Sequence, residues 1–266
     1  MDDITRGQVN DSAAQVYDQF FLPALFKAWP ERVLATAGVK LGQDVLDVAC
    51  GTGVLALAAA EKVGPDGAVI GLDVNAGMLA VARGKASIVE WRRGRAEELP
   101  FPDRSFDVVV CQFGLMFFDD RRTAIREMMR VLRPGGRLVV VVWDTLENTP
   151  GYLAVTRLLH RLFGDEVAEA IRAPYMLGDK QVLHTLFASV DLAEVGIQTH
   201  QGMARFPSLD AWMYTDVKGW TLAGVLDDAQ FELLLEEAKT DLGRFVGENG
   251  KVTFPAPAHF VRIVKD

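Results

Sequence analysis

A strand-like run that ends near an acid and then breaks into a glycine turn constrains this chain more than any other feature. Residues 45–55 read Val-Leu-Asp-Val-Ala-Cys-Gly-Thr-Gly-Val-Leu, and a helical Ala-Leu-Ala-Ala-Ala follows. Glycines let the backbone approach a ligand closely, and a helix that begins at such a turn directs free N–H groups into the same space. The segment therefore predicts a nucleotide-like cofactor beside a strand-turn-helix unit.

Two acids at strand ends narrow the choice of cofactor. A carboxylate beside a pyrophosphate is repelled, so Asp47 fits a dinucleotide poorly and better fits a cofactor with a positive charge, such as the amino-acid end of S-adenosylmethionine. A second apolar strand ends in Asp73 about one βαβ step later. At the carboxyl end of strand two, Asp73 can accept hydrogen bonds from both ribose hydroxyls. Dinucleotide enzymes carry such an acid too, so Asp73 alone does not discriminate.

Two further segments identify a family resemblance. Residues 94–107 read Gly-Arg-Ala-Glu-Glu-Leu-Pro-Phe-Pro-Asp-Arg-Ser-Phe-Asp and precede an apolar strand, and residues 127–138 read Glu-Met-Met-Arg-Val-Leu-Arg-Pro-Gly-Gly-Arg-Leu before another. With these four ordered motifs the chain resembles class I S-adenosylmethionine-dependent methyltransferases. It is most similar to the small-molecule branch that includes the ubiquinone/menaquinone-biosynthesis methyltransferases. The resemblance covers roughly residues 12–143 motif by motif.

Alternating β and α patterns from residue 41 predict an α/β fold with a doubly wound, mostly parallel, seven-stranded sheet, the Rossmann-like methyltransferase fold. The last strand is expected to return antiparallel between its neighbours. We expect helices over 53–62, 75–84, 119–132 and 227–243, the last beginning in a capping box of Asp227 and Gln230. We expect strands over 44–49, 68–73, 88–93, 107–112, 137–143 and 191–200, and a seventh from 252–254 and 259–264.

The chain is expected to form a single methyltransferase domain over residues 1–266 with two additions. Residues 1–40 form an N-terminal helical cap, with a helix from 13 to 29 that Pro23 distorts. Residues 145–225 interrupt the β/α alternation and show short helical patterns over 152–162 and 180–187. We interpret them as a helical lid insertion that covers the substrate.

The resemblance assigns the methionine end of the cofactor to the first strand and to the cap. Tyr17 is expected to reach the methionine carboxylate, although it is equally compatible with an ordinary packing aromatic. Asp47 is expected in the site, with a strand-end acid that satisfies loop amides as the alternative. Relatives commonly have glycine where this chain has Ala49. The expected backbone contacts come from Ala49, Cys50, Gly51 and Gly53.

Ribose and adenine are assigned to the next strand ends. Asp73 is expected to hold the ribose, with Val74 and Met78 packed against adenine, although a lone methionine is more often core. The Ala96 amide is expected to serve the adenine ring. Relatives commonly have Asp or Asn where this chain has Arg95, which donates hydrogen bonds but cannot accept them. Either Glu97 accepts from the exocyclic amine in its place, or the amine bonds to water or to the backbone.

Methyl transfer from a sulfonium requires an oriented acceptor and the exclusion of water more than it requires a catalytic side chain. Gln112, Phe113 and Phe117 follow strand four, where cofactor and acceptor meet, and are expected to line the transfer channel. Phe117 or Phe118 can instead pack under the next helix. Trp143 faces the same crevice in this topology. No catalytic base is named, because none of the four histidines lies in a recognisable constellation: His160, His184, His200 and His259.

Composition disfavours several classes of partner. The net charge of −8, from 28 basic and 36 acidic residues, opposes nucleic-acid binding, which needs a clustered basic face. No apolar run approaches the ~20 residues of a membrane span, and the first residues lack a secretory layout, which favours a cytoplasmic protein. Two cysteines provide neither a disulfide framework nor a cysteine-rich metal site.

The sequence therefore predicts methyl transfer from S-adenosylmethionine to a small, apolar or aromatic acceptor. An NAD-dependent oxidoreductase and a non-catalytic binding protein with the same fold are the alternatives. The acceptor, its reacting atom and the oligomeric state are left open.

Overall fold

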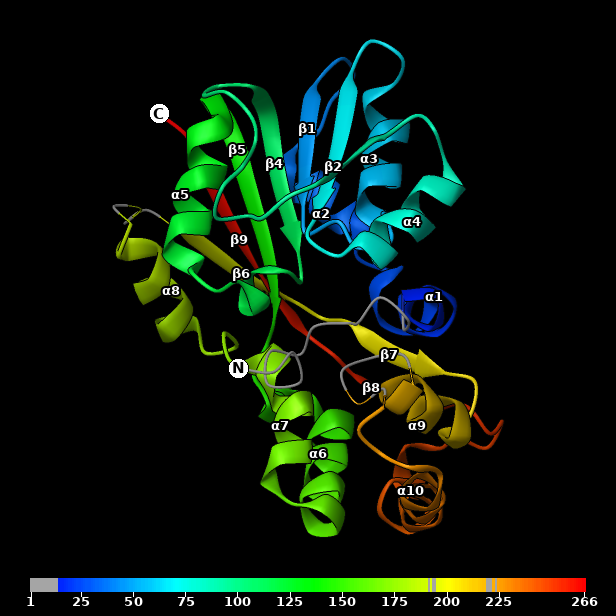
Figure 1. Cartoon of the computed structure of the whole chain (residues 1–266). Helices are drawn as coiled ribbons and strands as arrows, with labels where there is room; N and C mark the ends of the chain where they lie inside the picture. Colours follow the sequence, from blue (N-terminus) through cyan, green and yellow to red (C-terminus); the bar gives the residue numbers. More distant parts are fainter. Residues whose placement is uncertain (1–13, 191, 193–194, 219–221, 223) are drawn as a thin grey trace.

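A computed structural model describes residues 14–190, 192, 195–218, 222 and 224–266. The first thirteen residues of the expected cap, and part of the expected strand over 191–200, lie outside this description. Seven strands form one sheet in the order β3-β2-β1-β4-β5-β9-β6 (Figure 1). Their bounds are Asp44–Val48 (β1), Ala68–Asp73 (β2), Glu90–Arg93 (β3), Phe106–Gln112 (β4), Leu132–Trp143 (β5), Gly196–His200 (β6) and Ala258–Val264 (β9).

Hydrophobic strands in the middle of the sheet give it a doubly wound core. β1 pairs in parallel with β2 and β4, and β4 pairs in parallel with β5. Residues 138–142 of β5 are fully buried, as expected for a strand covered on both faces. β9 runs antiparallel between β5 and β6. The predicted fold is therefore confirmed, including the returning last strand.

The C-terminal strands differ from the prediction in one respect. Residues 252–254 do not belong to the seventh strand of the main sheet. They form β8 (Val252–Pro255), which pairs antiparallel with β7 (Met203–Phe206) in a separate two-stranded sheet. Pro255 and Pro257 lie at this break, and proline has no N–H to continue a ladder. The prediction of one continuous strand-forming tail was wrong.

The helices of the core agree with the prediction within two residues at each end. They are α3 (Val54–Val63), α4 (Ala76–Lys85) and α5 (Arg121–Val131). The predicted run over 137–143 begins earlier in the structure: β5 includes the Pro-Gly-Gly segment, and the register to β4 shifts there. Helix α2 (Pro30–Ala37) was not predicted; it packs on α3 and β5, with Pro30 in its first turn.

The N-terminal cap is helical but wider than an α-helix. After a short α1 (Ala14–Val16), residues Tyr17–Phe26 form a π-helix, η3, with Pro23 inside it. Proline cannot donate the bond that an α-helix needs, so the expected distortion takes this form. Lys85 of α4 pairs with Asp18 and donates to the Thr52 carbonyl at 2.9 Å. The cap is thereby fastened to the helix and turn that follow β1 and β2.

Apart from strands β6 and β9 of the main sheet, the elements that follow β5 lie in two places rather than in one insertion. Helices α6 (Pro150–Phe163), α7 (Asp165–Arg172), α9 (Leu209–Lys218) and α10 (Asp228–Asp241) lie with β7 and β8 below the sheet in Figure 1. Helix α8 (Lys180–Ala188) packs on α5 instead. The predicted helices over 152–162, 180–187 and 227–243 are all present, and the Asp227–Gln230 capping box forms. α7 and α9 were not predicted.

An aromatic core holds the lower unit together. Tyr152, Trp212 and Phe254 are each no more than 1% exposed, and their rings meet at centroid distances of 4.7–6.1 Å. Asp216 is buried among them and accepts a hydrogen bond from the Tyr152 hydroxyl at 3.1 Å. Burial raises the pKa of Asp216 well above its ordinary value. This carboxyl therefore prefers its neutral form in the folded protein.

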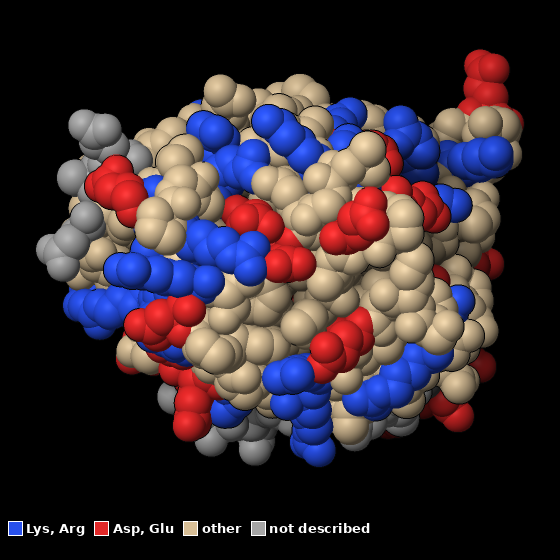
Figure 2. Space-filling view, turned by 90° about the horizontal axis from the view of Figure 1, so that it is seen from above, with Lys and Arg blue, Asp and Glu red and all other residues tan. Residues whose placement is uncertain are grey.

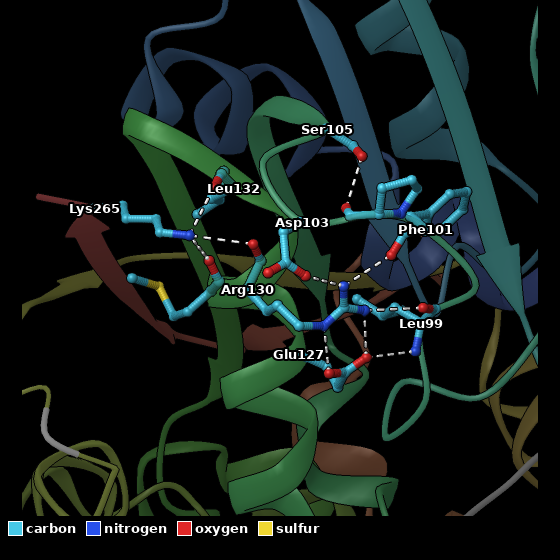
Figure 3. A network of polar contacts seen from close by, with 10 residues as sticks. Leu99, Phe101, Asp103, Ser105, Glu127, Arg130, Leu132 and Lys265 are labelled. Carbon is cyan, nitrogen blue, oxygen red and sulfur yellow. Dashed lines mark hydrogen bonds and ion pairs between the residues drawn. The ribbon is translucent and has the colours of Figure 1, made fainter.

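A second polar network joins the loop after β3 to α5 (Figure 3). Arg130 donates to the carbonyls of Leu99 (3.0 Å) and Phe101 (2.9 Å) and pairs with Asp103. Glu127 accepts from the Leu99 amide at 2.9 Å and pairs with Arg130. The motifs at residues 94–107 and 127–138 thus contact each other, and these contacts fix the loop that begins at the end of β3.

The C-terminal end of α5 and the upper edge of the sheet carry further charged contacts. Lys265 donates to the carbonyls of Met129 and Leu132, both at 2.7 Å, and thereby satisfies groups that a helix end leaves free (Figure 3). Arg133 bridges Asp44 and Asp107 at 2.8 Å each. Basic and acidic side chains are interspersed over the face seen in Figure 2.

Replacement of Arg130 by methionine is expected to destabilise the fold, because it removes charge-assisted bonds to two buried-loop carbonyls and leaves Glu127 without its partner. We expect the free energy of unfolding to fall by about 2 kcal/mol in urea titrations. Arg126→Met, on the exposed side of the same helix, is the control and should change it by less than about 0.5 kcal/mol. Equal effects of the two variants would contradict the clamp.

Asp216→Asn is expected to stabilise the protein in a pH-dependent way. Because the folded-state pKa is raised, the native protein loses stability as pH rises above the unfolded pKa of ~3.9 toward the raised value. Asparagine keeps an acceptor for Tyr152 without the charge. The melting temperature of the variant should therefore exceed that of the wild type more at pH 8 than at pH 5. Asp210→Asn, exposed on α9, is the control; a gain that is the same at both pH values would contradict the assignment.

Candidate cofactor site

The carboxyl ends of β1, β2, β4 and β5 meet in one cleft beside the cap. Two pockets adjoin here, with about 810 Å³ and 750 Å³ of empty space when the open solvent at their mouths is included. The two pockets share part of their lining: Ala49, Asp73, Val74, Phe117 and Phe118.

Most of the residues assigned from sequence come together here. The first pocket is lined by Tyr17, Ala49, Gly51, Asp73, Val74, Met78, Gln112, Phe113 and Phe117, and also by Phe26, Asn75, Gly114, Phe118 and Trp143. Ala96 and Glu97 line the second pocket, together with Arg95 and Asp119. Asp47, Cys50 and Gly53 line neither pocket.

Gly53 and Cys50 shape the turn from behind. Gly53 has a φ of +89°, and a Cβ there would lie 2.3 Å from the Trp91 ring. Its amide donates to the Cys50 carbonyl at 2.9 Å, while the Cys50 amide donates to Leu72 at 3.0 Å. These two amides are therefore used within the chain and hold the loop in place. Both cysteine thiols are free and buried.

Asp73 organises the site through backbone amides. Its carboxylate accepts from the Gly51 amide and from the Asn75 amide, each at 2.8 Å. Burial raises the pKa of Asp73, and these hydrogen bonds oppose the rise. A carboxylate has about four lone-pair sites, so Asp73 keeps capacity to accept from a ligand hydroxyl. Asp73 faces both pockets, as a ribose between methionine and adenine requires.

Asp47 is a buried acid behind the glycine loop. It is 1% exposed, and within the described residues neither of its carboxylate oxygens accepts a full hydrogen bond. Burial raises its pKa well above the ordinary value, and the negative charge of Asp73 adds to the rise. Such a carboxylate is costly unless a positive group compensates it. A cationic ligand at the loop would lower the pKa of Asp47 again.

Two residues in the left-handed region mark the strand ends. Ala49 follows β1 with a φ of +59°, and Phe113 follows β4 with a φ of +58°. Such conformations cost roughly 1–2 kcal/mol for a residue with a Cβ and cluster at binding sites. A Cβ on Gly114 would lie 2.6 Å from that of Ala49, so the two loops touch. The commoner glycine at position 49 would relieve this strain.

Aromatic rings form the wall that faces the cap. Phe113 stacks on Trp143 with centroids 3.9 Å apart and planes inclined by 17°. Phe26 lies 5.5 Å from Phe113, and Tyr17 stacks on Phe26 at 5.3 Å. Burial and the nearby Asp73 raise the pKa of Tyr17 far above its ordinary value, so its hydroxyl stays protonated.

Gln112 contributes an acceptor beside this wall. Its Oε1 is buried and has no hydrogen-bond partner within the part of the chain that the structure describes. An orphaned buried carbonyl costs about 1–3 kcal/mol, and a ligand donor would remove that cost. None of the histidines lines either pocket; His259, for example, is buried against the Gly178 carbonyl at 2.8 Å.

The adenine end differs from the expectation in its details. Glu97 accepts from the backbone amide of Asp119 at 3.0 Å, and its other oxygen lies 3.5 Å from Arg95. Arg95 also pairs with Asp119. The carboxylate of Glu97 therefore fixes the loop after β4 as well as lining the pocket. Asp119, a third acid in this pocket beside Asp73 and Glu97, was not found from the sequence, since no strand end or motif marks it.

Some missed residues did have a sequence signal. Asn75 precedes α4 directly, and its side chain caps this helix by accepting from the Met78 amide at 2.9 Å. Asn is a preferred cap residue, so this position was readable. Phe26 carried no signal, because its place depends on how the cap packs.

Over the residues described, no group of three or more His, Cys, Asp or Glu is arranged to hold a metal ion. Over the same residues, no helix has the length and apolar character that a bilayer span requires.

Solved structures agree with this architecture. The YcgJ protein of Bacillus subtilis aligns with a TM-score of 0.59 at 23% identity, over 90% of this chain and 98% of that one. A putative methyltransferase from an antibiotic biosynthesis pathway of Anabaena variabilis aligns with a TM-score of 0.63 at 18% identity, over 88% and 96%. At this identity the likeness concerns the fold.

Sequence relatives add the family. The ubiquinone/menaquinone biosynthesis C-methyltransferase UbiE of Hahella chejuensis is 43% identical over 150 residues, which are 53% of this chain and 60% of that protein. The demethylmenaquinone methyltransferase of Listeria monocytogenes is 40% identical over 157 residues, or 56% and 65%. The chain thus matches about 60% of the length of these relatives. The model of the ubiE/COQ5 methyltransferase family matches residues 4–159. The chain therefore belongs to the ubiE/COQ5 methyltransferase family, and its cofactor is S-adenosylmethionine.

Proposed function

We propose that this chain transfers the methyl group of S-adenosylmethionine to a ring carbon of a small aromatic acceptor of the quinol type. The observation that carries the proposal is the aromatic wall of Phe113 and Trp143, which adjoins the pocket lined by Asp73. The names of the relatives, a ubiquinone/menaquinone biosynthesis C-methyltransferase and a demethylmenaquinone methyltransferase, support the same acceptor class.

The residues at the strand ends fit S-adenosylmethionine in a definite order. Asp73 takes the ribose hydroxyls, and Asp47 supplies the negative charge that a methionine ammonium group needs. Val74 is 44% exposed and presents an apolar surface to adenine together with Met78. Ala96 and Glu97 lie in the second pocket, beyond Asp73, and complete the adenine end.

The acceptor end works by orientation and by exclusion of water. A planar ring packs on the Phe113–Trp143 pair, which favours offset or edge contacts. Gln112 Oε1 accepts from a ring hydroxyl and thereby turns the adjacent carbon toward the methyl group. Tyr17 stays protonated and does not serve as a base. An electron-rich ring carbon would therefore act as the nucleophile itself. Its bond to the methyl group would form as the sulfur–methyl bond breaks, S-adenosylhomocysteine would leave, and the ring proton would pass to solvent.

The segment 145–225 fits a lid over this acceptor. The short helix η6 (Ala173–Tyr175) contacts the helix η4 (Leu115–Phe117), which carries Phe117. Arg121 donates to the Met116 carbonyl at 2.7 Å and lies against the sulfur of Met176. The aromatic core of α6 and α9 gives this lid a firm base, so closure would involve the η6 region more than the whole unit.

Asp73→Ala is expected to weaken binding of S-adenosylhomocysteine by about 2–3 kcal/mol, because charge-assisted bonds to both ribose hydroxyls are lost. The variant also loses its bonds to the Gly51 and Asn75 amides, so calorimetry should be run well below its melting temperature. Asp66→Ala, in the exposed turn before β2, is the control. Unchanged affinity in Asp73→Ala would refute the ribose assignment.

Gln112→Leu tests the acceptor role and the proposed reaction together. The assay follows labelled methyl from S-adenosylmethionine onto 1,4-naphthohydroquinone and onto its dimethyl ether. We expect ring-carbon methylation by the wild type, and a loss of about tenfold or more in kcat/KM for the hydroquinone in the variant. The ether, which has no hydroxyl to donate, should show no such loss.

Stability and cofactor affinity provide the controls for this variant. Leucine removes an unsatisfied buried group, so the melting temperature should not fall, and affinity for S-adenosylhomocysteine should be unchanged. A drop in that affinity would move Gln112 to the cofactor. Binding of S-adenosylhomocysteine without methylation of any aromatic acceptor would refute the proposed function and favour a non-catalytic protein. The NAD alternative has no support from the family match.

A further inference from the structure

The cap helix η3 borders a third pocket on the side away from the cofactor cleft. This pocket has an open volume of about 760 Å³ and lies between η3, the β7–β8 sheet and α9. Figure 1 shows the N-terminal helix beside β7 and α9. The lining consists of Gln19, Phe20, Pro23, Ala24, Arg205, Phe206, Pro207, Thr215, Lys251, Val252 and Thr253.

The floor of this pocket is apolar. Ala24, Phe206 and Val252 are buried, with exposed fractions of 5%, 2% and 0%. At the rim, Phe20 is 37% exposed and its ring meets that of Tyr214, which is 39% exposed, in an edge contact at 5.7 Å. The partly exposed ring of Phe20 and the exposed Pro23 in the lining favour a ligand with a hydrocarbon part.

Two cations stand on the same side of the β7–β8 sheet. Arg205 is opposite Thr253 in the antiparallel register, and Lys251 lies two residues from Thr253, so all three side chains project from one face. Within the described residues neither cation has an ion-pair partner, and Arg205 has only a long contact of 3.4 Å to the Met203 carbonyl. Among the lining residues that the structure describes there is no Asp or Glu. The hydrocarbon ligand should therefore carry a negative group.

Helix η3 forms a wall of both the cofactor cleft and the third pocket. Tyr17 and Phe26 face the cofactor cleft, whereas Phe20, Pro23 and Ala24 face the third pocket. A ligand packed on one side of η3 holds the helix in the position from which Tyr17 contacts the other side. Binding on the two sides is then linked, and the linkage is reciprocal.

We propose that this third pocket binds a small amphiphilic carboxylate, with its chain on Phe20 and Pro23 and its head group between Arg205 and Lys251, and that its occupancy strengthens cofactor binding through η3. The inference does not depend on methyl transfer, because the site is separate from the acceptor wall.

Calorimetric titration with octanoate tests the proposal, with 1-octanol and octylamine as ligands of equal chain length and different charge. We expect octanoate to bind with a stoichiometry of one and both analogues to bind at least tenfold more weakly. The double variant Arg205→Gln/Lys251→Gln should lose about tenfold in octanoate affinity. Lys40→Gln/Lys62→Gln, which removes two exposed cations far from the pocket, should lose none.

These titrations distinguish a closed anionic site from a purely hydrophobic hollow and from a membrane-facing surface. Equal octanoate affinity in the two double variants, or equal affinity for octanoate and octanol, would overturn the anionic site. Binding to anionic lipid vesicles without binding of free octanoate would replace it by a membrane-facing surface. Saturating octanoate should tighten S-adenosylhomocysteine binding about threefold in the wild type only. An unchanged affinity would overturn the linkage, and methylation assays play no part in either result.

Discussion

The 2.8 Å hydrogen bond from the Gly51 amide to Asp73 joins the ends of β1 and β2, and the cofactor site depends on it. The second carboxylate oxygen holds the Asn75 amide, which places the first turn of α4. One buried acid therefore positions the glycine loop and the next helix before any ligand arrives. Asp47 is buried close behind the same loop, where burial and the charge of Asp73 both raise its pKa.

Much of the fold was predictable because short stretches of sequence determine the type and the ends of many elements. Continuous apolar runs such as residues 139–142 predict strands that helices cover on both faces, and the capping box at Asp227 marks a helix start. β7 was not predictable, because four residues without a turn signal gain their strand only from pairing with β8, about fifty residues later. The tail was misread for the same reason, since its first part pairs outside the main sheet.

The candidate site divides along the same line. Residues at strand ends, such as Asp73 and Gln112, could be placed from the order of motifs alone. Contacts that tertiary packing decides could not be predicted in this way. Gly53 lies against the Trp91 ring, and the Glu97 carboxylate turns toward the loop after β4. In the motif at residues 127–138, Glu127 and Arg130 hydrogen-bond to the backbone of the loop that contains Ala96. The motif alone does not reveal this structural role.

The packing of Trp91 has a consequence for how this sequence can change over evolution. Its ring occupies the space of two missing side chains, since a Cβ on Gly53 would lie 2.3 Å from it and one on Gly71 would lie 2.6 Å from it. Neither glycine can gain a methyl group while the indole stays, and a smaller residue at 91 would leave a void under the loop. These three positions should therefore covary: lineages that accept alanine at 71 need a narrower side chain at 91.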